Sequence, residues 1–120
     1  MGYFWYYGNS VELIFDISGE ATQELTQNYI SVEDILPTLK LEAKIFNFRY
    51  EPIMLFSNDP LVSNNEIKIN SNQVTLSINN ELSSRLVKGK YYLELVASHA
   101  DGYNETLFSS QQNNITFEVR

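Results

Sequence analysis

Residues 73–96, with the sequence QVTLSINNELSSRLVKGKYYLELV, decide the fold of this chain. Apolar and polar residues alternate over Gln73–Ile78, which is the period of a strand with one buried face. One helical turn is predicted over Glu81–Val87, capped by one of the two asparagines that precede it. Gly89 ends this turn, because glycine takes a positive φ without a Cβ penalty. A second strand follows from Tyr91, where the alternation resumes.

The order of these elements indicates a particular kind of corner. A helical turn that delivers a Gly-x-Tyr sequence into a central strand is typical of sandwiches that cross from one sheet to the other, as immunoglobulin-like domains do. We therefore assign Gly89 and Tyr91 a structural role. The hydroxyl of Tyr91 is expected to bond a backbone group of the Glu81–Val87 corner.

The remaining apolar pattern predicts one all-β domain over residues 1–120. Short strands at intervals of about 8–12 residues are typical of an immunoglobulin-like antiparallel β-sandwich of about seven to nine strands. A small barrel is the alternative, and one or two short helical turns are expected, the second over Val32–Leu36. The predicted strands are Tyr3–Tyr7, Ser10–Ser18, Leu39–Tyr50, Ile53–Phe56, Glu66–Ile69, Gln73–Ile78, a strand from Tyr91, Tyr103–Ser109, and a last strand through Ile115, Phe117 and Val119.

Two of these strands carry irregularities. In Leu39–Tyr50 the apolar phase changes at Phe46, which predicts a β-bulge or a change of sheet. Pro52 cannot donate to a sheet ladder, so Ile53–Phe56 is expected at a sheet edge or a bend. Between the strands, Gly19–Asn28 is predicted to be a loop and Ser110–Asn113 a polar turn.

The composition narrows the possible partners and compartments. A net charge of −7 and a pI near 4.5 argue against unassisted binding to nucleic acid or to an anionic membrane surface. The chain has no Cys, which excludes disulfides and thiolate metal sites. No signal peptide is recognisable, so synthesis in a cytoplasm is expected, and no apolar run is long enough to span a bilayer.

The candidates for chemistry are few, and we expect no enzyme activity and no cofactor. His99 is the only histidine, and the sequence Ser98-His99-x-Asp101 is interpreted as turn composition rather than a catalytic triad. Carboxylates that pair can serve glycoside hydrolysis, but fifteen acids in 120 residues make accidental pairs common. The acids considered for such a pair are Glu33, Asp34, Asp59, Glu94, Asp101 and Glu105.

Two loops contain oxygen ligands of the kind that calcium takes, without EF-hand spacing. We interpret both as ordinary turns, so no metal is expected. The first loop contains Asn58, Asp59, Asn64, Asn65 and Glu66, and the second contains Asp101, Asn104 and Glu105.

The first strand is aromatic on both faces. Tyr3, Trp5 and Tyr7 point one way, and Phe4 and Tyr6 point the other. Three interpretations stay open: a core strand, a docking surface for a partner, since Tyr and Trp anchor interfaces, or a platform on which a sugar stacks. Tyr3, Trp5 and Tyr7 are the candidate partner-binding residues, and Tyr92 and Tyr103 could extend the surface.

Several of these segments together resemble a family of small phage virion domains. The family includes the N-terminal domain of phage baseplate upper proteins and related immunoglobulin-like decoration domains. The resemblance covers about half of the chain and departs from antibody-type domains, which have bridging cysteines and an acidic residue where Val87 stands. It rests on Trp5–Leu13 (WYYGNSVEL), Val74–Ile78 (VTLSI), Asn79–Leu82 (NNEL), Gly89–Leu95 (GKYYLEL), Asp101-Gly102 and Ile115–Val119 (ITFEV).

This resemblance implies a non-enzymatic virion structural protein of a tailed phage, made in the host cytoplasm and located in the virion. It implies an auxiliary capsid or head decoration protein first, with a baseplate or tail adaptor component as the alternative. The expected partners are other virion structural proteins in a multi-copy assembly, where avidity over many copies can replace strong single contacts. A carbohydrate-binding module is the alternative from a different class.

Overall fold

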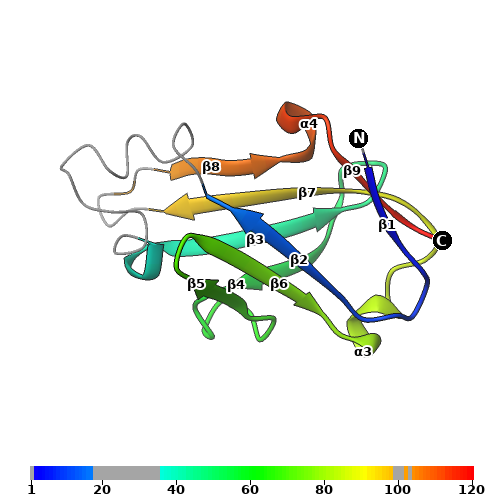
Figure 1. Cartoon of the computed structure of the whole chain (residues 1–120), viewed down its shortest axis with the longest axis horizontal. Helices are drawn as coiled ribbons and strands as arrows, with labels where there is room; N and C mark the ends of the chain where they lie inside the picture. Colours follow the sequence, from blue (N-terminus) through cyan, green and yellow to red (C-terminus); the bar gives the residue numbers. More distant parts are fainter. Residues whose placement is uncertain (1, 18–35, 99–101, 103) are drawn as a thin grey trace.

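Two β-sheets packed face to face form the structure, a computed structural model that describes residues 2–17, 36–98, 102 and 104–120 (Figure 1). The prediction of an all-β sandwich is confirmed. The larger sheet has the strand order β1-β9-β7-β3-β4, and β8 also pairs with β7. Its strands are β1 (Gly2–Trp5), β3 (Lys40–Phe46), β4 (Pro52–Ser57), β7 (Gly89–Ser98), β8 (Asn104–Ser109) and β9 (Thr116–Val119).

The smaller sheet has the order β2-β6-β5 and covers one face of the larger one. All strand pairs in the two sheets are antiparallel except β1 and β9, which run parallel. The expected fully antiparallel arrangement is therefore wrong at this one pair. The strands of the smaller sheet are β2 (Val11–Asp16), β5 (Ile67–Asn70) and β6 (Gln73–Ile78).

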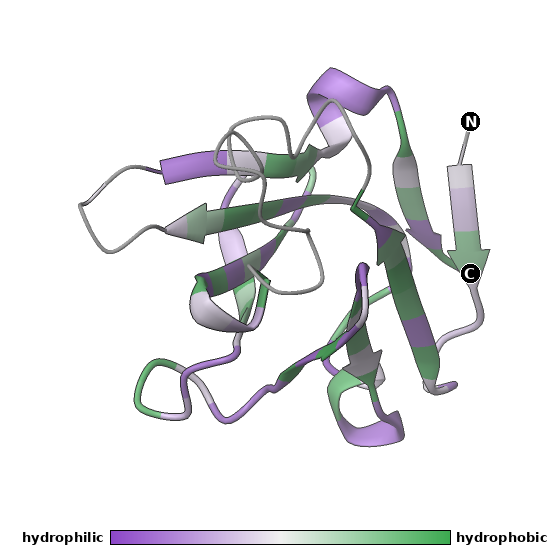
Figure 2. Ribbon diagram, turned by 60° about the vertical axis from the view of Figure 1, so that its left-hand side comes forward, coloured by the Kyte–Doolittle hydropathy of each residue, from purple (hydrophilic) through white to green (hydrophobic). Residues whose placement is uncertain are grey.

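The core lies between the sheets and follows the alternation of the sequence. Every second residue of β3, β6 and β7 is buried, and Figure 2 shows this alternation as bands of hydrophobic and hydrophilic residues along the strands. The inward residues of these three strands are Leu41, Ala43, Ile45, Val74, Leu76, Ile78, Tyr91, Leu93, Leu95 and Ala97.

In the described part of the chain, no helix has the length and apolar character to cross a bilayer.

The predicted corner between the sheets is confirmed. Helix α3 (Asn80–Ser83) follows β6, and the Asn79 side chain caps it by accepting a hydrogen bond from the Leu82 amide at 2.9 Å. Gly89 has the expected positive φ, 151°, but the prediction that it ends the helical turn is wrong, because α3 ends at Ser83 with Ser84 as its C-cap and Gly89 is the first residue of β7. The Tyr91 hydroxyl donates a hydrogen bond of 2.5 Å to the Val87 carbonyl oxygen, which lies in the predicted corner segment.

The prediction of one long strand over Leu39–Tyr50 is wrong beyond Phe46. Strand β3 ends there, and a tight turn returns the chain into β4, with a register shift between Ile45 and Phe46. The Asn47 side-chain oxygen accepts hydrogen bonds from the amides of Arg49 and Glu51, which closes the turn. The expected bulge is thus present, but the change of the apolar pattern at Phe46 corresponds to the hairpin between β3 and β4 and not to a continuing strand. Strand β4 is an edge strand, as predicted from Pro52.

Two other segments differ from expectation or lie outside the described residues. Ser110–Asn113, predicted to be a polar turn, forms the helical turn α4 between β8 and β9. The 3₁₀ turn η1 (Leu36–Thr38) begins where the predicted helical turn Val32–Leu36 ends. The rest of that prediction and the Gly19–Asn28 loop fall outside the described residues.

Candidate interaction surface

Four aromatic side chains at the N-terminus are exposed, and we call them the N-terminal aromatic surface: Tyr3, Phe4, Tyr6 and Tyr7. Tyr3 lies on the face of β1 that also carries Trp5, and Phe4 lies on the opposite face. Each is about half exposed, between 48% and 59%. Tyr3 and Phe4 lie on β1, whereas Tyr6 and Tyr7 lie in the turn that leads to β2. Exposed clusters of aromatic residues are unusual on a monomer surface and are typical of interaction sites.

Trp5 does not belong to this surface, so its assignment as a partner-binding residue is wrong. Its side chain is only 7% exposed, because the parallel register sets it opposite Val119 on the inward face of the sheet. Its ring lies 6.5 Å from that of Phe117. A sugar platform on Trp5 is excluded for the same reason. The other two predicted residues, Tyr3 and Tyr7, are exposed.

Contacts with the corner hold the N-terminal aromatic surface in place. The Tyr7 hydroxyl donates a hydrogen bond to the Ser84 carbonyl oxygen at 3.1 Å, and the Asn80 side-chain amide donates to the Gly8 carbonyl oxygen at 2.8 Å. The turn between β1 and β2 is therefore tied to α3, and Figure 1 shows the two side by side. A fixed turn reduces the ordering entropy that binding would cost.

The C-terminal strand supports the other end of the surface. The Arg120 guanidinium lies 3.8 Å from the centre of the Phe4 ring, and its Nε donates to the Glu118 carboxylate at 2.7 Å. The rings of Phe4 and Tyr6 meet edge to face at 5.9 Å. Tyr3 stacks on Phe117 with a ring separation of 5.8 Å. The surface thus combines aromatic faces with one cation that is already neutralised by a neighbouring carboxylate.

A second aromatic group, which we call the hairpin aromatic group, lies at the same end of the larger sheet: Phe46, Phe48, Tyr50 and Tyr92. The rings of Tyr50 and Tyr92 stack at 4.6 Å with an angle of 10° between their planes. Phe46 pairs with Tyr92 across β3 and β7, so both face away from the core, as Phe4 does. Tyr92 therefore lies on the outward face of β7, in the hairpin aromatic group, and Tyr103 falls outside the described residues.

Sequence reasoning missed the rest of the hairpin group because Phe48 and Tyr50 were placed in a strand. Tyr50 instead has a φ of 61°, which only a turn accommodates. The signal that could have shown this is the sequence Asn47-x-x-Tyr50-Glu51-Pro52, in which asparagine and proline favour a turn.

The candidate catalytic residues are not assembled in the described part of the chain. Glu94 lies opposite Lys44 in the register of β3 and β7, and Asp59 forms an ion pair with Lys40 at 3.5 Å. Among the described residues, no group of three or more His, Asp or Glu side chains lies close enough to hold a metal ion. The other candidates Glu33, Asp34, His99 and Asp101 fall outside the described residues.

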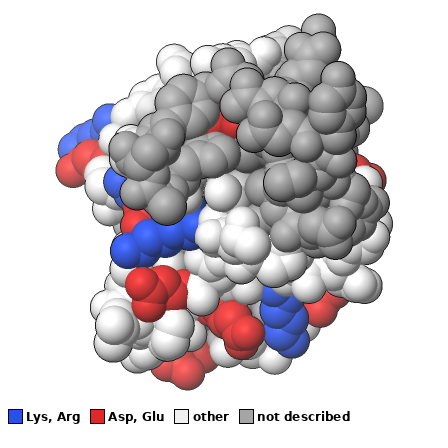
Figure 3. Space-filling model, turned by 90° about the vertical axis from the view of Figure 1, so that its left-hand side faces the viewer, with Lys and Arg blue, Asp and Glu red and all other residues white. Residues whose placement is uncertain are grey.

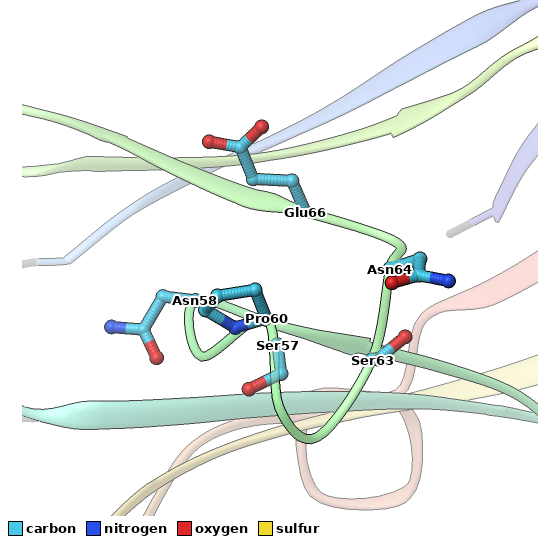
Figure 4. Close-up of a pocket in the computed structure, with 6 residues that line it drawn as sticks. All are labelled: Ser57, Asn58, Pro60, Ser63, Asn64 and Glu66. Atoms are coloured by element: carbon cyan, nitrogen blue, oxygen red, sulfur yellow. The ribbon is translucent and has the colours of Figure 1, made fainter.

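The first calcium candidate forms an ordinary loop. A hollow of about 330 Å³ lies here, lined by Asn58, Asn64 and Glu66 among others, but Figure 4 shows these three side chains pointing in different directions. Asn58 is already bonded to β3, since it accepts from the Leu41 amide at 2.8 Å and donates to the Leu39 carbonyl oxygen at 2.7 Å. The Asn58 side chain is thus committed to holding the loop against β3.

Charge is not concentrated on the end of the molecule that carries the β4–β5 loop. Figure 3 views this end and shows basic and acidic side chains interspersed over the part of the face that is described. The described face therefore offers no single-sign patch of the kind that attracts a polyion.

Comparison with known proteins adds no assignment. The sequence matches no protein-family model, and no curated protein is significantly similar to it.

Proposed function

We propose that this chain is a non-enzymatic structural protein of a tailed-phage virion, and that it decorates the head as an auxiliary protein. The observation that carries the proposal is the N-terminal aromatic surface, which is exposed and held in place by α3 and the C-terminal strand. The resemblance of the corner and strand motifs to immunoglobulin-like virion domains supplies the class of partner.

The geometry suits attachment to a repeated lattice. A fixed group of half-exposed tyrosine and phenylalanine rings buries large areas at low entropic cost when a partner covers it. Four such rings are a small contact for one copy. On a lattice that offers many equivalent positions, avidity compensates for the modest strength of each contact.

The proposal is tested by following the protein during infection. A tagged chain is expressed in the host, and particles are purified by density-gradient centrifugation and labelled with an antibody against the tag. We expect the chain to band with intact particles at a fixed ratio to the major head protein, with label on the head. Label on the tail tip would favour the baseplate or tail adaptor alternative, and recovery of the protein only outside the particles would contradict both.

A further inference from the structure

Among the described residues, strand β2 has one edge without a partner strand. It lies at the border of the smaller sheet and pairs with β6 on one side, and no other described strand pairs with it. The Ile17 amide donates to the Asn72 carbonyl oxygen at 2.8 Å, which continues the β2–β6 register. Because hydrogen-bonded and non-hydrogen-bonded pairs alternate in an antiparallel ladder, the main-chain groups of Glu12, Ile14 and Asp16 point away from β6.

An apolar groove runs beside this edge, between the two sheets. Its volume is about 140 Å³. The rings of Phe15 and Phe108 meet in its wall at 4.8 Å, and Ile14 at the rim is 54% exposed although it is a large apolar side chain. An edge strand with an exposed large apolar residue at its centre is a template for pairing with another chain. The groove is lined by Tyr3, Leu13, Phe15, Phe108, Ile115 and Phe117 together with Glu12 and Ile14.

We propose that the β2 edge accepts an extended segment of another protein as an additional strand, and that this segment has the pattern basic-x-apolar-x-basic. Main-chain hydrogen bonds to Glu12, Ile14 and Asp16 supply the pairing, and alternate side chains of the segment enter the groove. We expect basic residues in the segment because the exposed carboxylates of Glu12 and Asp16 lie on either side of Ile14 along β2. Opposite charges directly across a strand pair are favourable.

A second copy of this chain fits the edge poorly. When two β2 strands pair antiparallel about Ile14, Glu12 of each copy faces Asp16 of the other, and like charges directly opposite are unfavourable. The net charge of −7 on each copy adds repulsion. The same carboxylates that prevent self-pairing therefore select a basic partner. This inference does not rest on the proposed function, because it concerns pairing to the main chain of β2. The two share one residue, Tyr3, which lines the groove and belongs to the N-terminal aromatic surface.

A short peptide tests the inference directly. The probe is the capped sequence Gly-Val-Lys-Val-Ile-Val-Lys-Val-Gly, which is symmetric about its isoleucine and so presents the pattern in either strand direction. In titrations followed by NMR, we expect slower hydrogen exchange at the amides of Glu12, Ile14 and Asp16. The same peptide with glutamate in place of lysine should bind about tenfold more weakly. Methylating the peptide amides that face β2 should abolish binding.

Charge reversal on the edge provides the matched control. Glu12→Lys/Asp16→Lys should reverse the preference, so that the glutamate peptide binds more tightly than the lysine peptide. Glu51→Lys/Glu81→Lys changes the net charge equally at exposed positions elsewhere and should keep the original preference. The inference is overturned if the three edge amides show no added protection, if both double variants shift the preference alike, or if the chain pairs with itself through β2.

Discussion

Tyr91 connects two elements through a single hydroxyl group. Its ring is buried in the core, and its hydroxyl reaches the Val87 carbonyl oxygen between α3 and β7. Burial raises the pKa of Tyr91 above the ordinary value of 10.0, because the charged phenolate is poorly solvated there. The residue therefore fixes the corner only in its neutral form.

Removing this hydroxyl should weaken the fold. Tyr91→Phe keeps the ring but leaves the Val87 carbonyl oxygen without its donor, so we expect a loss of about 1 kcal/mol or slightly more in the free energy of unfolding. Urea denaturation measures it. Tyr92→Phe, which removes a hydroxyl from the outward face of the same strand, serves as the control and should have a smaller effect. Equal midpoints for wild type and Tyr91→Phe would count against the corner.

The stability contributed by Tyr91 should depend on pH in the alkaline range. Its pKa is higher in the folded than in the unfolded state, so its contribution is complete below pH 10 and decreases as the pH rises toward the folded-state pKa. The stability difference between wild type and Tyr91→Phe should therefore shrink above pH 10. Denaturation of both proteins between pH 8 and pH 11 measures this difference, a range from about two units below to about one unit above the ordinary tyrosine pKa. A stability difference that stays constant over this range would contradict the expectation.

At the scale of elements, α4 interrupts the border of the larger sheet. Strands β8 and β9 pair with the same edge of β7, and α4 lies between them in the sequence. The buried Ser110 hydroxyl accepts a hydrogen bond of 2.8 Å from the Leu93 amide at this junction. One side chain thus replaces the ladder bond that a continuous strand would have made.

Ser110→Ala should destabilise the protein because it leaves the buried Leu93 amide without an acceptor. Such a loss costs about 1–3 kcal/mol. Thermal or urea unfolding measures it, with Gln111→Ala on the exposed side of α4 as the control. If the two variants unfold alike, Ser110 does not have this role.

The elements that the sequence predicted well are those with strict alternation. Gln73–Ile78 matches β6 to the residue, and the alternation predicted to resume at Tyr91 continues through β7. Where apolar residues fall in a turn, as at Phe48 and Tyr50, the pattern suggested a strand instead. The helical turn α4 consists of polar residues without apolar periodicity, so no hydrophobic signal marked it.

The candidate surface was only partly predictable because its exposure depends on a distant pairing. Alternation correctly placed Tyr3 and Trp5 on one face of β1. Whether each is covered depends on β9, which lies more than a hundred residues away and pairs in parallel. Local sequence carries no information on that register, so Trp5 was assigned to the surface and Phe4 and Tyr6 were not.

At the scale of the whole molecule, the exposed aromatic residues gather at one end. The N-terminal aromatic surface and the hairpin aromatic group share the end of the larger sheet where β7 begins. Leu61, the most exposed large apolar residue in the described part of the chain, lies in the β4–β5 loop, outside both groups. Attachment to a lattice through the aromatic end would leave that loop free.

The most direct test of the proposed function is a binding isotherm on virions stripped of the chain. Purified wild-type protein, Tyr3→Ser/Tyr6→Ser and the control Leu61→Ser are added to such particles, and bound protein is quantified after sedimentation. We predict that wild type and Leu61→Ser bind alike and saturate, whereas Tyr3→Ser/Tyr6→Ser binds at least about tenfold more weakly while unfolding at a similar urea concentration. Equal binding of all three proteins, or no saturable binding by wild type, would contradict the account.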